Sequence, residues 1–261
     1  MFVARLFTHG KQSRQQKLLY AAKNGNVSRL LLLFDNDPMI LRRAVLNENY
    51  PEGLTPLHLS AENGFLDAVK VLVDNGSDVT SMDAYGRSAL YLAASNDYPE
   101  VCGYLVKARS PLYCCIYEKE GEAMKESPLH RACEKGYLTV VKVLVSGGAD
   151  INLRVSDLSL LFNDAPIHRA AKEGQLECIK FLVAAGALLD IINDDGNTPL
   201  HLAAYCGHTH VVEFLIISGK VHILVLIFMQ LTPFSNLISP YKCPYVRCIH
   251  FYIKWKTSRM S

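Results

Sequence analysis

A seven-residue frame recurs along this chain and constrains its fold more than any other feature. The clearest copy begins at Thr55 and reads Thr-Pro-Leu-His-Leu-Ser-Ala. Successive copies begin 33, 39, 38 and 33 residues apart. A repeat of this length predicts stacked copies of one small unit, each needing its neighbours to bury its apolar face. The copies occupy residues 17–22 (eroded), 55–61, 88–94, 127–133, 165–171 and 198–204.

Each copy has the residues expected of a helical hairpin. Thr55 can cap a helix through its hydroxyl, and Pro56 suits the first helical position because its nitrogen needs no partner there. Gly64 can take the left-handed backbone that ends that helix. A second apolar pattern with helical spacing follows at residues 68–73. We therefore expect two helices per copy, with the glycine between them.

The frame and its 33-residue spacing resemble the ankyrin repeat. The resemblance covers residues 17–219, divided into six copies. It implies an all-α solenoid of stacked helix–turn–helix units joined by short β-hairpin fingers. It also implies a protein partner, bound on the concave face that fingers and first helices form. The expected repeats are residues 17–53, 54–86, 87–126, 127–164, 165–196 and 197–219, between a disordered basic leader (1–16) and a non-repeat hydrophobic and basic tail (220–261).

The third copy departs most from the pattern. It carries Ala89 in place of the proline, Tyr91 in place of the histidine and Asp97 in place of the glycine. We expect it to be the least regular interior repeat.

Candidate binding residues lie in the segments between repeats. Two spacings are long, which predicts extended fingers at about residues 108–126 and 152–164. Their apolar and aromatic side chains could anchor a partner or fold back over the helices and close the core. Regular finger tips are expected to face solvent and set specificity. The candidates are Tyr113, Tyr117, Leu160, Leu161 and Phe162 in the long fingers, and Asp83, Tyr85, Arg87, Asp194, Asp195 and Asn197 at the regular tips.

The distribution of charge indicates which class of partner to expect, and the cysteines indicate the compartment. Residues 18–219 hold 17 basic and 25 acidic residues, whereas residues 220–261 hold six basic residues and no acid. The acidic repeats have no basic patch of the kind that binds nucleic acid, so no nucleic-acid partner is expected.

The chain has eight cysteines, and their spacing does not match a disulfide framework. They predict free thiols in a reducing compartment, which is the cytoplasm, with the nucleus as a second possibility.

Catalysis and metal binding are not expected. The histidines of the frame recur once per repeat, about 10 Å apart, which is too far for one ion. We expect them to hydrogen-bond to backbone between repeats. Cys243, Cys248 and His250 resemble half of a zinc site, but a structural zinc needs four ligands. Without a phosphate loop or nucleophile motif, the sequence indicates no enzyme, no cofactor and no metal site.

The segment after residue 219 breaks the pattern. Its apolar run at residues 221–229 is shorter than the roughly 20 residues that span a membrane. Three interpretations stay open: a cap on the last repeat, a membrane-surface or partner-binding segment, or the aberrant end of an incomplete chain. The leading function is a non-catalytic interaction scaffold. The alternative is the ankyrin region of a membrane-associated channel, transporter or anchor, with contact through residues 221–238.

Overall fold

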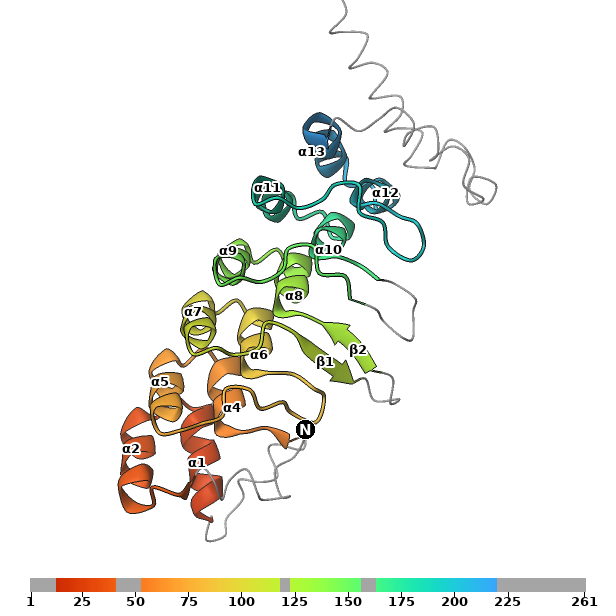
Figure 1. Ribbon diagram of the computed structural model, residues 1–261. Coiled ribbons are helices and arrows are strands. Elements are labelled where there is room, and N and C mark those ends of the chain that lie inside the picture. Colours follow the sequence, from red (N-terminus) through yellow and green to blue (C-terminus); the bar gives the residue numbers. More distant parts are fainter. Residues whose placement is uncertain (1–12, 41–52, 118–122, 156–162, 220–261) are drawn as a thin grey trace, which may run out of the picture. The chain divides into compact units, whose positions relative to one another are not determined.

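The computed structural model describes residues 13–40, 53–117, 123–155 and 163–219, which form helix pairs (Figure 1). Each expected copy of the frame supplies the first helix of a pair, so the predicted helical hairpins are confirmed. The first helices are α1 (Arg14–Lys23), α4 (Pro56–Glu62), α6 (Ala89–Ser95), α8 (Pro128–Lys135), α10 (Pro166–Lys172) and α12 (Pro199–Tyr205). The second helices are α2 (Val27–Asn36), α5 (Leu66–Asp74), α7 (Pro99–Lys107), α9 (Leu138–Ser146), α11 (Leu176–Ala184) and α13 (Thr209–Gly219).

The long segment between α7 and α8 contains a β-hairpin. Strand β1 (Cys114–Tyr117) pairs antiparallel with β2 (Ala123–Glu126), and Cys114 lies opposite Glu126 in the register. The extended finger predicted at residues 108–126 is therefore a two-stranded sheet.

The chain divides into two compact units, which are described separately here. The first contains α1 to α7, the hairpin, the start of α8 and most of α9. The second contains the end of α8 and helices α10 to α13.

Helices begin where the sequence predicts because the capping groups are local. The hydroxyl of Thr55 accepts a hydrogen bond from the backbone N–H of His58, and Thr198 caps α12 in the same way. Ser88 caps α6 by accepting from the N–H of Tyr91. Ala165 offers no oxygen at this position, and α10 begins without that bond.

Within the first unit, first helices pack on first helices and second helices on second helices. Helices α1, α4 and α6 form one row, and α2, α5 and α7 form the other (Figure 1). The layer between the rows is dry: Leu57, Leu72, Leu90 and Leu105 are at most 2% exposed. Burial of such a leucine contributes about 1.5–3 kcal/mol.

The second unit repeats this arrangement. Helix α10 packs on α12, and α11 packs on α13. Its interior contains Ile167, Ile179, Leu182 and Leu200, each no more than 3% exposed.

The glycines after α1, α4 and α10 each leave room for a side chain of the following repeat. Gly25 has φ +63°, and a Cβ there would lie 2.6 Å from the ring of Phe65 in the following repeat. Gly64 supports Tyr98 in the same way at 2.5 Å, and Gly174 supports His208 at 2.6 Å. These glycines are needed both for a left-handed backbone and for close approach.

The third repeat is the irregular one, as expected. Asp97 and Arg109 take left-handed backbone, with φ 60° and 64°. Gly64 and Gly76 take the same backbone at the corresponding positions of the preceding repeat. A side chain in this region costs free energy that glycine does not.

Candidate functional site

The histidine of the repeated frame joins a helix to the finger that follows it. The N–H of Thr55 donates to Nδ1 of His58 at 3.2 Å, so Nε2 carries the hydrogen and donates to the carbonyl oxygen of Arg87 at 3.1 Å. In the second unit, Nε2 of His168 donates to the carbonyl oxygen of Asn197 at 3.0 Å. The predicted hydrogen bonds to backbone between repeats are confirmed at both histidines.

These rings are held neutral. Burial lowers the pKa of His58, His168 and His201, because a charged imidazole would lose its hydration there. Both nitrogens of His58 are engaged with the protein itself. Across residues 13–40, 53–117, 123–155 and 163–219, no cluster of three His, Cys, Asp or Glu could hold a metal ion.

The regular finger of the first unit is braced from within by Asp83. Its carboxylate accepts from the backbone N–H of Tyr85 at 3.0 Å and of Arg87 at 2.8 Å. It also pairs with the Arg87 guanidinium at 2.6 Å, and that guanidinium lies 4.8 Å from the centre of the Tyr85 ring. The side chain of Asp83 is 0% exposed, so the expectation that it faces solvent was wrong. The carboxylate points inward because it accepts from two N–H groups of its own turn and pairs with Arg87.

Tyr85 and Arg87 are half-buried and remain at the surface of this finger. Met82, beside them, is 38% exposed. The accessible part of the finger therefore includes Met82, Tyr85 and an arginine whose charge is paired with Asp83.

The extended finger is tied to the helices through the residue that replaces the histidine. The Tyr91 hydroxyl donates to the Glu126 carboxylate at 2.6 Å, and both residues are buried. Glu126 ends strand β2, so this bond anchors the hairpin to α6. Tyr113, just before β1, is 67% exposed. Tyr117 ends β1, and its side chain lies outside the described residues.

The regular finger of the second unit uses an amide where the first uses a carboxylate. Asn193 Oδ1 accepts from the N–H of Asn197 at 2.9 Å, and its Nδ2 donates to Asp164 at 3.0 Å. Asp164 also faces the Arg169 guanidinium at 3.3 Å. Asn197 is half-buried by this network.

Charged tips lie at the surface of the same finger. Asp194 and Asp195 are exposed, and Asp194 pairs with Arg154 at 3.2 Å. Both ends of this pair are near 40% exposed, so it contributes at most about 1 kcal/mol.

Sequence reasoning missed two exposed aliphatic residues in this finger. Leu188 and Ile192 are each 51% exposed, and the N–H of Leu188 donates to Asn152 Oδ1 at 3.0 Å. The run Leu188-Leu189-Asp190-Ile191-Ile192 was a usable signal, because so many aliphatic residues are unusual in a short turn. Leu160, Leu161 and Phe162 lie outside the described residues.

The described cysteines support the thiol prediction in part. Cys102, Cys133 and Cys178 are buried free thiols, and Cys206 is an exposed one. Burial raises the pKa of Cys102 to about 12 and of Cys178 to about 11. Thiols with such pKa values behave as small apolar side chains at neutral pH.

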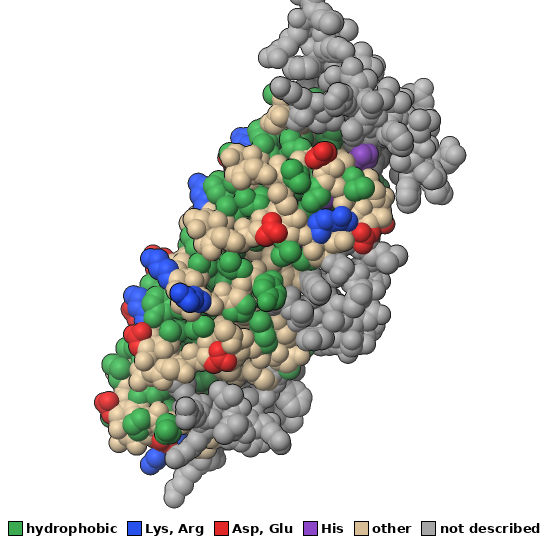
Figure 2. Space-filling view, viewed as in Figure 1, with side chains coloured by type: hydrophobic (Ala, Val, Ile, Leu, Met, Phe, Trp, Pro, Cys, Tyr) green, Lys and Arg blue, Asp and Glu red, His purple; other side chains and the backbone are tan. Residues whose placement is uncertain are grey.

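Charge is dispersed over the face drawn in Figure 2. The described Lys and Arg side chains on this face occur in small separate groups, with acidic side chains between them. None of the helices in the described part of the chain is long and apolar enough to cross a membrane. The segment at residues 221–238 lies outside that part.

Comparison with known proteins decides the family. The family model for ankyrin repeats in three copies matches residues 18–114 and again residues 129–224. The chain belongs to the ankyrin-repeat family. The ankyrin repeat domain of human ASB11 superposes with a TM-score of 0.62 at 23% identity, over 77% of this chain and 83% of that one. This likeness shows the shared fold.

Relatives differ widely in their full architecture. The Notch-regulated ankyrin repeat-containing protein of Xenopus laevis is 34% identical over 106 residues, which cover 41% of this chain and 91% of that protein. Tyrosine-protein kinase HTK16 of Hydra vulgaris is 34% identical over 154 residues, or 53% of this chain and 19% of the kinase. Protein phosphatase 1 regulatory subunit 27 of Mus musculus is 37% identical over 65 residues, or 25% of this chain and 42% of that subunit. The chain thus spans less than half the length of the last two.

Ankyrin repeats are protein-interaction modules, and the module itself is in general non-catalytic. The protein therefore contains a domain of the class that binds protein partners.

Proposed function

We propose that this protein is a non-catalytic adaptor whose fingers and first helices bind a protein partner. The proposal rests on one observation about the fingers. Hydrogen bonds to partly or fully buried side chains fix their backbone, while large apolar side chains on the same fingers stay exposed to water. Residues 17–219 would form the interaction domain.

In the first unit, His58 and Asp83 fix the regular finger, and the Tyr91–Glu126 bond anchors the extended one. Preorganised loops bind more tightly because less conformational entropy is lost on association. Tyr113 is the natural anchor, since tyrosine offers large area with few rotatable bonds.

In the second unit, the network of Asn193, Asp164 and Asn197 fixes the finger that displays Leu188 and Ile192. Asp194 and Asp195 lie beside these aliphatic residues and would select partners by charge. We propose the cytoplasm as the compartment, with the nucleus as a second one, which suits the buried free thiols.

Proximity labelling with the full chain in its native cell would identify the partner, and purified partner would then be titrated against variants. We expect Tyr113→Ala, and separately Leu188→Ser combined with Ile192→Ser, to weaken binding at least about tenfold. Ile217→Ser is the matched control, because Ile217 is 63% exposed but lies on the second helix α13. Equal affinity of all three variants and the wild type would refute the finger surfaces.

A further inference from the structure

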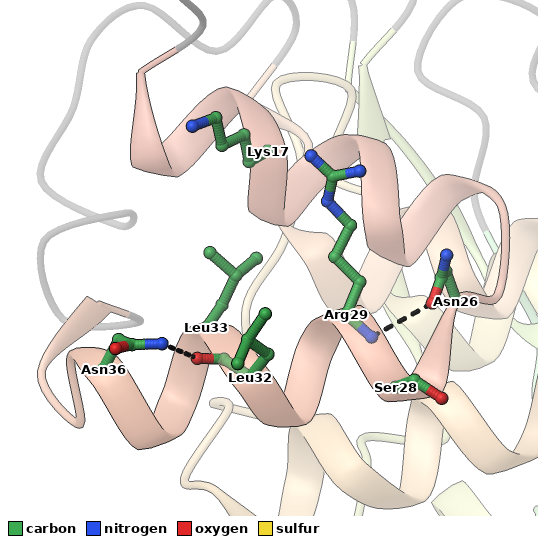
Figure 3. A pocket seen from close by; sticks show the side chains of 7 residues that line it. All are labelled: Lys17, Asn26, Ser28, Arg29, Leu32, Leu33 and Asn36. Atoms are coloured by element: carbon green, nitrogen blue, oxygen red, sulfur yellow. Dashed lines mark hydrogen bonds between the residues drawn. The ribbon is translucent and has the colours of Figure 1, made fainter.

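A second surface lies between the two helices of the first repeat. Helices α1 and α2 border an open pocket of about 430 Å³ (Figure 3). Lys17 comes from α1, whereas Arg29, Leu32 and Leu33 come from α2. In Figure 3, Arg29 extends from α2 toward α1, and Leu33 points into the same gap.

The apolar part of this pocket is exposed to an unusual degree. Leu32 is 61% exposed, and its neighbour Leu31 is 45% exposed. Isolated surface leucines are ordinary, but these two adjoin a pocket whose wall is mostly apolar. Apolar side chains gathered beside a pocket in this way favour a surface that a partner covers.

The polar groups at the ends of the pocket serve the helix itself. Asn26 Oδ1 accepts from the N–H of Arg29 at 3.0 Å, and Asn36 Nδ2 donates to the carbonyl oxygen of Leu32 at 2.6 Å (Figure 3). The remaining lining residues are two cations, two leucines and Ser28. Among the described residues, no acidic side chain lines the pocket.

We propose that this pocket binds a partner protein segment in which acidic residues lie beside leucine or another large apolar residue. Charge complementarity favours this occupant, because Lys17 and Arg29 flank the leucines without a neutralising acid in the wall. The leader of this chain is a poorer occupant, since residues 1–12 contain Arg5 and Lys11 and no acid. An amphipathic helix meets the requirement by placing its apolar face in the groove and its acids at the rim.

The test uses the full chain and two synthetic 14-residue amphipathic peptides with the same leucine positions. One carries glutamate at every polar position, and the other carries lysine. We expect the glutamate peptide to bind at least about tenfold more tightly by fluorescence anisotropy. It should shift the NMR amide signals of residues 26–36 in the labelled protein.

Three variants localise the site. Leu32→Ser should weaken binding of the glutamate peptide about tenfold, and Lys17→Glu combined with Arg29→Glu should weaken it at least as much. Lys107→Glu is the control, because Lys107 is exposed on α7 and lies outside the pocket. Equal binding of both peptides, or binding that survives the pocket variants, would overturn the proposal.

Other occupants give distinct results. If deletion of residues 2–12 is required before the peptide binds and itself shifts the signals of residues 26–36, the leader occupies the pocket and the proposal fails. If sedimentation shows a dimer that Leu32→Ser dissociates, a second copy occupies it, and the proposal again fails. Neither result bears on the finger surfaces, which the Tyr113 and Leu188/Ile192 variants test separately.

Discussion

The Nε2 atom of His58 lies 3.1 Å from the carbonyl oxygen of Arg87, 29 residues further along the chain. Because Nδ1 of the same ring accepts from Thr55, one side chain fixes both a helix start and the next finger. The imidazole of His58 therefore links the start of its own helix to the backbone of the next repeat.

Replacement of this histidine should lower stability strongly. His58→Leu leaves the N–H of Thr55 and the carbonyl of Arg87 without their ring partners, and we expect the free energy of unfolding to fall by about 2–4 kcal/mol. Urea denaturation measures it. Lys107→Leu, at an exposed residue of α7, is the control and should change stability by less than about 0.5 kcal/mol. A loss at His58 no larger than the control would contradict this link.

Stability should fall as the solution becomes acidic. Burial lowers the pKa of His58, His168 and His201 below the ordinary value of 6.5, so the unfolded chain binds protons more readily than the folded one. Their contribution is fully present above pH 6.5 and is lost as pH falls from there through the folded pKa values. Urea midpoints between pH 5 and 8 test this. His58→Gln should flatten the dependence, and an unchanged slope would argue against His58.

Glycine in the third repeat should stabilise it. Arg109→Gly relieves a left-handed backbone at φ 64°, and we expect the free energy of unfolding to rise by about 1 kcal/mol. The reverse change one repeat earlier, Gly76→Ala, is a matched control because no atom lies within 4 Å of the new Cβ. It should lower stability by a similar amount. In thermal denaturation the melting temperature should rise for Arg109→Gly and fall for Gly76→Ala. Shifts of both variants in the same direction would refute this explanation.

The hairpin should loosen when its buried anchor is removed. Tyr91→Phe deletes the hydroxyl that donates to Glu126, with an expected loss of about 1–2 kcal/mol. Hydrogen exchange at residues 114–117 and 123–126 should accelerate more than exchange in α5. Tyr113→Phe, at an exposed ring, should leave exchange unchanged. Uniform acceleration over the whole chain would indicate global destabilisation instead of a local anchor.

The sequence predicted the helices well because their determinants are local. Thr55 and Pro56 favour a helix start through their own side chains and backbone. Gly64 favours the left-handed backbone that ends the same helix. Asp97 likewise marked the third repeat as irregular.

The finger surfaces could be predicted only in outline. Asp83 reads as a polar tip, but it is buried because its own turn folds around it. Leu188 and Ile192 were not among the predicted binding residues, yet half of each side chain faces water. Exposure in a short loop depends on which contacts the neighbouring segments provide, and local residue patterns do not contain that information.

The glycine that supports an aromatic ring of the following repeat has an evolutionary consequence. Gly25 packs closely against Phe65, and Gly64 against Tyr98. In each contact the two residues belong to successive repeats. When a single repeat is duplicated or exchanged, its contacts with both neighbouring repeats change. They are kept only if the new repeat has a glycine that fits the ring of the repeat after it and a flat side chain that fits the glycine of the repeat before it. Recombination among such genes should therefore preserve this pairing even where the surface residues diverge freely.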